Sequence, residues 1–417
     1  MSEAISVSAH ETPLEEIDVS RPEIFQNETW RPWFERLRNE APVHYLAESE
    51  FGPFWSVTSH EAIKAVDTNH KVFSSEAGGI AIPDLVVDEN TVQSSSFIQL
   101  DEPAHGQQRS TVAPSVAPKN LAQLEPLIRE RAADILDHLP VGETFNWVQE
   151  VSVELTGRML ATLFGFPYED RHKLIHWSDI TTAVPQLTGD DSVDMSERYN
   201  ELMACAGAFY ELWADRAAKP PQFDLVSMLA HGENTKSMHE NPELFIGTIM
   251  LLIVGGNDTT RNSISGGVIA LNENPDEYQK LRDNPGLIPN MVAEMIRWQT
   301  PVIHMRRTAL ADIELGGKQI RSGDKVVMWY LSGNRDDQVF DDADAFRIDR
   351  RNARAHVAFG FGIHRCMGNR LAEMQLRVLW EEIMKRFTHV ELVGEVERLP
   401  SNFIRGIKTV PVRLHAR

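Results

Sequence analysis

The sequence predicts a mainly α-helical fold with a small β region. Apolar residues recur with helical periodicity along most of the 417 residues, whereas strand-like runs are few and short. The segment between Pro242 and Pro275 contains no proline, and its first half is strongly apolar. Because an internal proline would break or kink a helix, this segment predicts one long central helix.

Helices are expected in nine segments and strands in four. Helical periodicity favours residues 30–40, 59–67, 118–139, 148–163, 194–219, 241–274, 275–283, 287–298 and 368–387. Strand signals cover residues 54–58, 313–315, 318–320 and 325–329. Gly316-Gly317 lies between two of these strands and predicts a tight hairpin turn.

Length and composition indicate one large domain. No linker, low-complexity tract or repeat divides the chain, so we expect a single domain over residues 30–417 after a polar segment at 1–29. That segment lacks the basic start and apolar centre of a signal peptide or membrane anchor, and the longest apolar run, 249–254, is too short to span a bilayer. The two cysteines, Cys205 and Cys366, form no disulfide framework, which favours a reducing, cytoplasmic location.

The charge distribution excludes one class of partner and suggests another. A net charge of −20 argues against nucleic-acid binding. Between residues 347 and 386, however, nine Lys/Arg stand against four Asp/Glu. This local positive excess is either a solvated basic face or a docking surface for an acidic partner.

The segment around Cys366 carries the chemistry expected of a thiolate ligand to a haem iron. Gly360 and Gly362 permit backbone angles that a Cβ would block, and Gly368 allows close approach to a flat macrocycle. The helix expected after the loop would place the sulfur near a helix N-terminus, which favours the thiolate. A zinc site would need about four ligands, and no CxxC partner is present. A buried structural cysteine would not explain the glycines or His364.

The loop Phe359-Gly-Phe-Gly-Ile-His-Arg-Cys-Met-Gly368 resembles the cysteine-ligand loop of the cytochrome P-450 superfamily of haem-thiolate monooxygenases. The resemblance covers roughly residue 30 to the C-terminus. It implies the P-450 fold with a long central helix over the haem, and haem b (iron protoporphyrin IX) as cofactor, ligated by Cys366.

A second motif, Gly255-Gly256-Asn257-Asp258-Thr259-Thr260, lies in the middle of the expected central helix. Two glycines there cost about 1 kcal/mol each relative to alanine, and such a departure often marks a function. The motif resembles the family's oxygen-activating G-G-x-D-T, with an expected kink that opens space for a small ligand. Splitting dioxygen needs protons in a water-poor pocket, which an alcohol (Thr259) and an acid (Asp258) can deliver. Alternatively, Asp258 is an interior ion-pair partner and Thr259 a helix-bending hydroxyl.

Further pairs match supporting positions of the family. Glu294 and Arg297 resemble the structural E-x-x-R pair, whose side chains share one helix face. Its usual third partner is replaced here, and either Arg347 or Arg350 is expected to take its role. Four residues match positions that bind the two haem propionates: His105, Arg109, Arg307 and His364.

The expected substrate is apolar. Segments that line the pocket in the family are rich here in aliphatic residues, and the pocket is expected to include Ile82, Leu85, Val184, Leu187, Val254, Gly255, Val302, Ile303, Met305 and Phe403. The same side chains could instead pack against one another. His304 and Gln186 could contact a polar head group, although solvent-facing positions are expected for both.

Residues 252–263 and 301–307 most resemble soluble bacterial members that hydroxylate alkanes and fatty acids at the terminal carbon, and some relatives oxidise terpenes. Terminal attack requires positioning, because a primary C–H bond is stronger than its neighbours. The partners implied are dioxygen, a ferredoxin and its reductase, with no nucleic acid and no membrane anchor. A peroxide-driven hydroxylase, a terpene hydroxylase and a non-catalytic haem-thiolate gas or ligand sensor are the alternatives.

Overall fold

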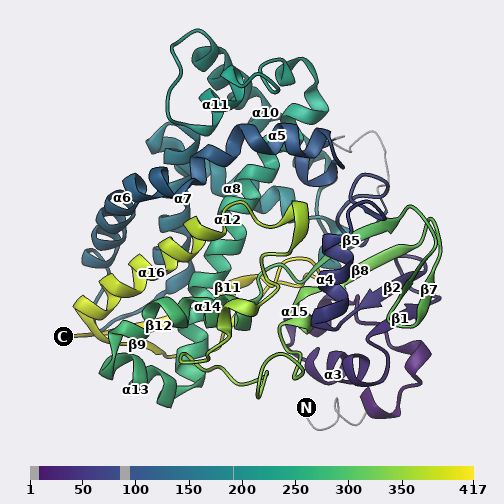
Figure 1. The fold of residues 1–417 in the computed structure, drawn as a ribbon. Helices are drawn as coiled ribbons and strands as arrows, with labels where there is room; N and C mark the ends of the chain where they lie inside the picture. The colour runs from purple at the N-terminus through teal and green to yellow at the C-terminus, as the bar shows by residue number, and fades with distance from the viewer. Residues whose placement is uncertain (1–8, 85–93, 191) are drawn as a thin grey trace.

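The computed structural model describes residues 9–84, 94–190 and 192–417. Helices form most of the molecule, and the largest sheet lies at one side of it (Figure 1). The prediction of a mainly α fold with a small β region is therefore confirmed. The α-helices are α2 (Pro22–Gln26), α3 (Arg31–Glu40), α4 (His60–Thr68), α5 (Ala104–Val112), α6 (Pro118–Asp137), α7 (Glu154–Phe164), α8 (Arg171–Thr182), α9 (Pro185–Thr188), α10 (Met195–Ala217), α11 (Leu225–His231), α12 (Pro242–Glu273), α13 (Pro275–Asp283), α14 (Ile288–Gln299), α15 (Tyr330–Gly333) and α16 (Asn369–Arg386).

The strands form one five-stranded sheet and three smaller ones. The large sheet has the order β1-β2-β8-β5-β3, in which β2 and β8 are parallel and the other pairs antiparallel. Its strands are β1 (Val43–Leu46), β2 (Phe54–Val57), β3 (Phe73–Ser74), β5 (His304–Ala309) and β8 (Lys325–Trp329). The smaller sheets contain β4 (Thr144–Asn146), β12 (Pro411–Ala416) and β9 (Phe387–Leu392); β10 (Glu397–Arg398) and β11 (Ile407–Thr409); and β6 (Ile313–Leu315) and β7 (Lys318–Ile320).

The long helix α12 crosses the middle of the helical body (Figure 1) and packs against α7, α8, α14 and α16. Its glycines allow this close packing. A Cβ at Gly256 would lie 2.7 Å from the Leu160 side chain of α7, and one at Gly267 would lie 2.7 Å from the Met295 sulfur of α14. The predicted central helix is therefore present, and it forms much of the largest apolar core.

The chain before residue 30 is also folded onto the domain where the structure describes it. Ile24 and Phe25 of α2 are buried in an apolar cluster, and the Phe25 ring lies 6.1 Å from the Trp329 ring of β8. The structured domain thus begins before residue 30. Within the described residues no helix is long and apolar enough to cross a membrane.

Local assignments differ from expectation at several places, and helices such as α5, α8 and α11 and strands such as β1, β9 and β12 were not predicted. The helix predicted over 148–163 is a π-helical turn, Val148–Val153, followed by α7. Strand β5 was not predicted, because Arg306, Arg307 and Thr308 are buried in it and no apolar alternation is visible. The predicted strands at 313–315, 318–320 and 325–329 match β6, β7 and β8.

Candidate functional site

A cavity of about 420 Å³ lies beside α12 and brings the two sequence motifs together. Cys366 and Phe359 line it from the loop before α16, and Gly255 and Thr259 line it from α12. These segments are more than 90 residues apart in the sequence. A thiol and a hydroxyl can act on the same bound group only if both line one cavity, and Cys366 and Thr259 do so.

The loop that carries Cys366 has the geometry expected from its glycines. Gly360 and Gly362 have φ values of +62° and +64°, which L side chains rarely adopt. The Cys366 N–H donates to the Phe359 carbonyl over 2.8 Å, which folds the loop back before α16 begins at Asn369. Cys366 is exposed to the cavity. Desolvation by the surrounding protein raises the pKa of its thiol, whereas backbone N–H groups at the start of α16 and the Arg109 charge lower it.

Asp67, at the C-terminal end of α4, contacts this loop and holds its backbone. Its buried carboxylate accepts hydrogen bonds from the Phe361 N–H at 2.7 Å and the Tyr330 hydroxyl at 2.8 Å, and it pairs with Arg307 at 2.9 Å. A Cβ at Gly362 would collide with the Asp67 carbonyl. Asp67 therefore couples the cysteine loop to Arg307, a role that no sequence signal indicated.

His105, Arg109, Arg307 and His364 all line the same cavity. Both ring nitrogens of His105 lie within hydrogen-bond distance of carbonyl oxygens, those of Phe97 and Ile363. His364 contacts the Ser75 hydroxyl through Nε2 at 3.1 Å, while its buried Nδ1 has no partner. Burial and the nearby cations lower the pKa of His364 to about 2. The cations that lower this pKa include Arg307 and Arg109. Their positive charge also favours an anionic group at this edge of the cavity.

Helix α12 runs past Gly255-Gly256 without a break, so the interruption of the backbone ladder expected there is absent. The two glycines make room in different ways. A Cβ at Gly255 would meet no atom within 4 Å, because this position faces the cavity, whereas Gly256 packs against α7. The Thr259 hydroxyl, also at the cavity, donates to the Gly255 carbonyl over 3.1 Å.

Asp258 does not line the cavity, because successive helical residues are rotated by about 100°. Its buried carboxylate pairs with Arg261 at 2.7 Å and accepts from the Asn257 amide at 3.1 Å. Arg261 also pairs with the half-exposed Asp179 of α8 at 2.8 Å, so charged groups extend from Asp258 towards solvent. Burial raises the pKa of Asp258 to about 6, although Arg261 acts in the opposite direction.

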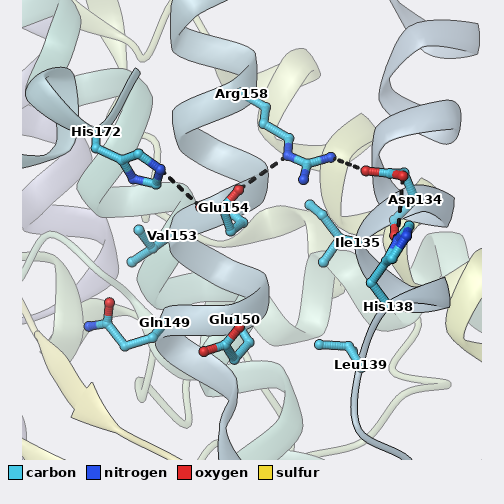
Figure 2. A pocket seen from close by; sticks show the side chains of 10 residues that line it. All are labelled: Asp134, Ile135, His138, Leu139, Gln149, Glu150, Val153, Glu154, Arg158 and His172. Carbon is cyan, nitrogen blue, oxygen red and sulfur yellow. Dashed lines mark hydrogen bonds and ion pairs between the residues drawn. The ribbon is translucent and has the colours of Figure 1, made fainter. Parts of the chain in front are cut away.

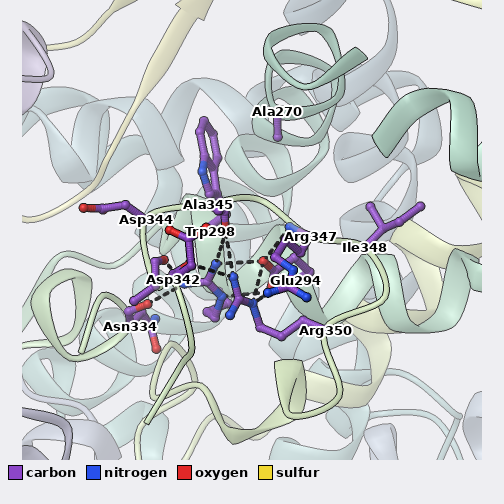
Figure 3. Close-up of polar contacts among 12 residues, drawn as sticks. Ala270, Glu294, Trp298, Asn334, Asp342, Asp344, Ala345, Arg347, Ile348 and Arg350 are labelled. Carbon is purple, nitrogen blue, oxygen red and sulfur yellow. Dashed lines mark hydrogen bonds and ion pairs between the residues drawn. The ribbon is translucent and has the colours of Figure 1, made fainter. Parts of the chain in front are cut away.

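Glu294 and Arg297 of α14 form the expected pair, and Figure 3 shows Arg350 and Arg347 beside Glu294. Glu294 accepts two 2.7 Å hydrogen bonds from Arg297. The Arg350 guanidinium approaches both carboxylate oxygens, at 3.0 and 3.1 Å, whereas Arg347 contributes its backbone N–H at 2.9 Å. Arg350 thus takes the role that the sequence left open between these two arginines.

Comparisons with known proteins agree with this geometry. A family profile, "Cytochrome P450", matches residues 286–413. Linalool 8-monooxygenase of Pseudomonas putida is 38% identical over 96% of this chain and 99% of its own length. The chain belongs to the cytochrome P450 family. A methyl-branched lipid omega-hydroxylase of Mycobacterium tuberculosis is 31% identical over 99% of both chains. The solved structure of CYP153D17 from Sphingomonas sp. is 46% identical, with a TM-score of 0.91 over 96% of this chain and 100% of that chain.

The P450 is therefore a monooxygenase with haem b as cofactor, and the predictions of family, enzyme class and cofactor are confirmed. The alternative of a non-catalytic sensor is not supported, because the relatives are named as a monooxygenase and a hydroxylase. The residues present fit this group. The cavity offers the Cys366 thiol, open space at Gly255 and an edge that favours anions, with a buried, unpartnered Nδ1 on His364. When bound, haem supplies the iron chemistry that activates dioxygen.

Only part of the predicted substrate pocket lines the cavity of this P450. The lining residues among those predicted are Leu187, Val254, Gly255, Val302, Met305 and Phe403. Ile82 and Ile303 do not reach it, because both are fully buried in the separate apolar cluster around Trp329. Val184 lies at the N-cap of α9 and does not line the cavity, and Leu85 lies outside the described residues. His304 is fully buried, contrary to its expected solvent-facing position, while Gln186 is exposed as expected.

The basic excess over residues 347–386 is smaller at the surface than in the sequence. Arg350 is buried against Glu294, and four further cations of the segment pair with nearby carboxylates: Arg354, Arg377, Lys385 and Arg386. Arg365 and Arg370 are exposed on either side of Cys366. Arg347 and Arg351 of the segment are exposed as well. Directly beside Cys366, a basic face rests on Arg365 and Arg370.

A second hollow, of about 390 Å³, lies between α6, α7 and the start of α8 (Figure 2). Three carboxylates, those of Asp134, Glu150 and Glu154, line it beside one arginine, which pairs with two of them. Arg158 pairs with Asp134 at 2.6 Å and Glu154 at 3.2 Å, and His172 lies 3.5 Å from Glu154. No group of three or more His, Cys, Asp or Glu side chains suited to a metal ion occurs in the described part of the chain. The cavity at Cys366 is thus the candidate site.

Proposed function

We propose that this P450 hydroxylates a linear alkane or a fatty acid at its terminal carbon. Dioxygen supplies the oxygen atom, and NAD(P)H supplies electrons through a reductase and a ferredoxin. The observation that carries the proposal is the cavity in which Cys366 and Thr259 face a largely apolar space. In this scheme Cys366 is the thiolate ligand, and His105, Arg109, Arg307 and His364 surround the propionates.

The lining of the cavity favours an unfunctionalised chain over a charged one. Along α12 and its neighbours the wall consists of aliphatic side chains and hydroxyls: Met250, Leu251, Val254, Thr181, Thr260 and Ser263. The cations that line the cavity within the described residues are those at the anion-favouring edge. A free carboxylate elsewhere in the cavity would lose hydration without gaining a counter-ion. Alkanes are therefore the first substrates to test.

The terminal position is supported by a relative and by physical reasoning. The mycobacterial relative, which matches over 99% of both chains, is named an omega-hydroxylase of methyl-branched lipids, a name that refers to a chain end. A primary C–H bond reacts only when the protein presents it in preference to weaker secondary bonds. An apolar cavity that admits a chain end first provides that selection.

Thr259 and Asp258 are proposed to manage protons. The Thr259 hydroxyl lies at the cavity and can hold a proton or a water molecule there. Asp258 has a pKa of about 6 and connects through Arg261 to the half-exposed Asp179. A carboxyl that changes protonation near neutral pH can pass protons inward. Because Asp258 does not line the cavity, a rotation of its side chain or a water molecule must complete the path.

The electron donor is proposed to dock at the exposed Arg365 and Arg370, which flank the thiolate loop in the sequence. A ferredoxin is an acidic protein, so opposite charges would steer it to this side of the haem. A free thiol at the active centre also suits the reducing interior of a cell.

A terpene substrate is the second candidate, because linalool 8-monooxygenase is 38% identical over nearly the whole chain. The two proposals are separated by titrating the holoenzyme with octane, dodecanoic acid and linalool and following the Soret spectrum, then identifying products with ferredoxin, reductase and NAD(P)H. The proposal expects 1-octanol or 12-hydroxydodecanoic acid as the main product. Hydroxylation of linalool with no oxidation of either linear substrate would reject it in favour of the terpene.

A further inference from the structure

Strand β5 presents its two faces to different parts of the molecule. Met305 and Arg307 line the cavity, whereas the alternate residues His304 and Arg306 contact the chain segment 78–84. This follows from the period of two along a strand. The segment runs close to β5, because the Arg306 N–H donates to the Ile80 carbonyl over 2.7 Å. Ile80 itself lines the cavity.

The close approach depends on Gly78 and on a neutral His304. A Cβ at Gly78 would lie 2.5 Å from both the Arg306 guanidinium and the Thr308 hydroxyl. His304 donates through Nδ1 to the Asn402 carbonyl at 2.8 Å and accepts from the Ile82 N–H through Nε2 at 3.1 Å. Burial lowers the pKa of His304 to about 4, so the ring keeps its accepting nitrogen at neutral pH.

Asp84 joins this segment to two strands at once. Its carboxylate pairs with Arg306 of β5 at 2.7 Å and with Lys325 of β8 at 3.1 Å. Lys325 also donates to the Phe51 carbonyl at 2.7 Å. We call Asp84, Arg306 and Lys325 the Asp84 triad.

The triad is asymmetric in burial, which makes Asp84 its critical member. The two cationic side chains are each 7% exposed, while that of Asp84 is 68% exposed. In the described parts of the chain, Asp84 is the one carboxylate that pairs with either cation. Burial and the neighbouring Arg306 lower the pKa of Lys325, and Asp84 raises it. Removing the carboxylate would leave two buried, mutually repelling cations.

We propose that the Asp84 triad determines substrate size selectivity by holding the chain at Ile80 against the cavity wall. The inference rests on the proposed function only in treating this cavity as the substrate pocket. Asp84 and Lys325 touch no part of the cavity themselves, so they act as positioning residues through Ile80. Without the triad, Ile80 would leave the wall, and a long apolar ligand would lose contact on that side while a small ligand would not.

The test uses two ligands that bind haem iron through the same ring but differ in length, imidazole and 1-dodecylimidazole. Their affinities for the holoenzyme are measured from the Soret shift. Asp84→Asn should weaken 1-dodecylimidazole by roughly fivefold to tenfold, because an apolar contact is lost, and leave imidazole within twofold. Asp84→Glu, which keeps the charge, should restore most of the preference.

Two further variants keep the test decisive. Gly78→Ala displaces Arg306 without changing any charge and should lower the same preference. Asp312→Asn removes an exposed carboxylate that pairs with Arg321 on the nearby hairpin and should leave both affinities unchanged. Unaltered affinities in Asp84→Asn and Gly78→Ala, or an equal loss for both ligands, would overturn the proposal. Because neither probe is a substrate, this outcome is independent of whether alkanes are hydroxylated.

Discussion

Replacing Glu294 by glutamine tests whether the cluster of Glu294, Arg297 and Arg350 depends on one buried charge. Glu294 and Arg297 are fully buried, and Arg350 is 4% exposed. The carboxylate is the counter-charge for both guanidinium groups, which otherwise donate to backbone carbonyls, those of Asn334 and Ala343 for Arg297 and that of Asp342 for Arg350. Glutamine has the same shape but no charge, so Glu294→Gln leaves two buried cations without their anion.

Breaking a buried ion pair by removing one partner destabilises a protein by about 3–5 kcal/mol. An unfolding entropy of about 2.1 cal/mol/K per residue gives about 0.9 kcal/mol/K for a chain of 417 residues, so the Tm should fall by about 3–6 °C. Arg297 and Arg350 lower the pKa of Glu294 despite its burial. The ionised carboxylate therefore stabilises the fold above the ordinary glutamate pKa of 4.5, and this contribution is lost as the pH falls through the lower folded-state pKa.

The assay is thermal unfolding of the holoenzyme, followed by far-ultraviolet circular dichroism and by the Soret band. The Tm difference between wild type and Glu294→Gln should be full at pH 7 and should shrink below pH 4.5. Glu381→Gln is the matched control, because Glu381 also pairs with two arginines, Arg129 and Arg377, but is 27% exposed, and such pairs contribute about 1 kcal/mol or less. Equal Tm values for the two variants would refute the reasoning.

Four further outcomes are expected. Cys366→Ser should lose the thiolate-type Soret band of the reduced, CO-bound protein, and retention of that band would contradict the ligand assignment. Thr259→Ala should still consume NAD(P)H but form hydrogen peroxide instead of product, and product and peroxide per NAD(P)H measure this. Asp258→Asn should slow turnover and remove the change in activity that we expect of wild type around pH 6, which a pH profile of turnover measures. Arg365→Glu combined with Arg370→Glu should weaken ferredoxin binding, most strongly at low salt, and a salt-independent, unchanged affinity would argue against this docking surface.

Features that depend on local chemistry were predicted from the sequence. The cysteine loop is recognisable because Gly360 and Gly362 must adopt positive φ within a few residues of the thiol. The central helix follows from a long apolar segment bounded by prolines, and the hairpin follows from Gly316-Gly317, whose φ values are +56° and +72°. Arg261 was missed, although its i+3 spacing from Asp258 was a visible signal.

Features that depend on pairing between distant segments needed the tertiary structure. Nothing near Asp67 in the sequence indicates that it contacts the cysteine loop and Arg307, about 300 and 240 residues away.

The basic excess over 347–386 illustrates the same limit. It is a property of the sequence, yet burial and ion pairs with other helices leave Arg365 and Arg370 as the exposed cations beside Cys366.

By itself, the sequence determined the family, the motif around the cysteine and the main helices, because each depends on residue types and their spacing within a short segment. The tertiary structure alone decided which aliphatic residues line the cavity, which arginine completes the Glu294 pair and where Asp258 points. Those outcomes depend on which side of a helix or strand faces which partner, and that is set by the packing of the whole chain.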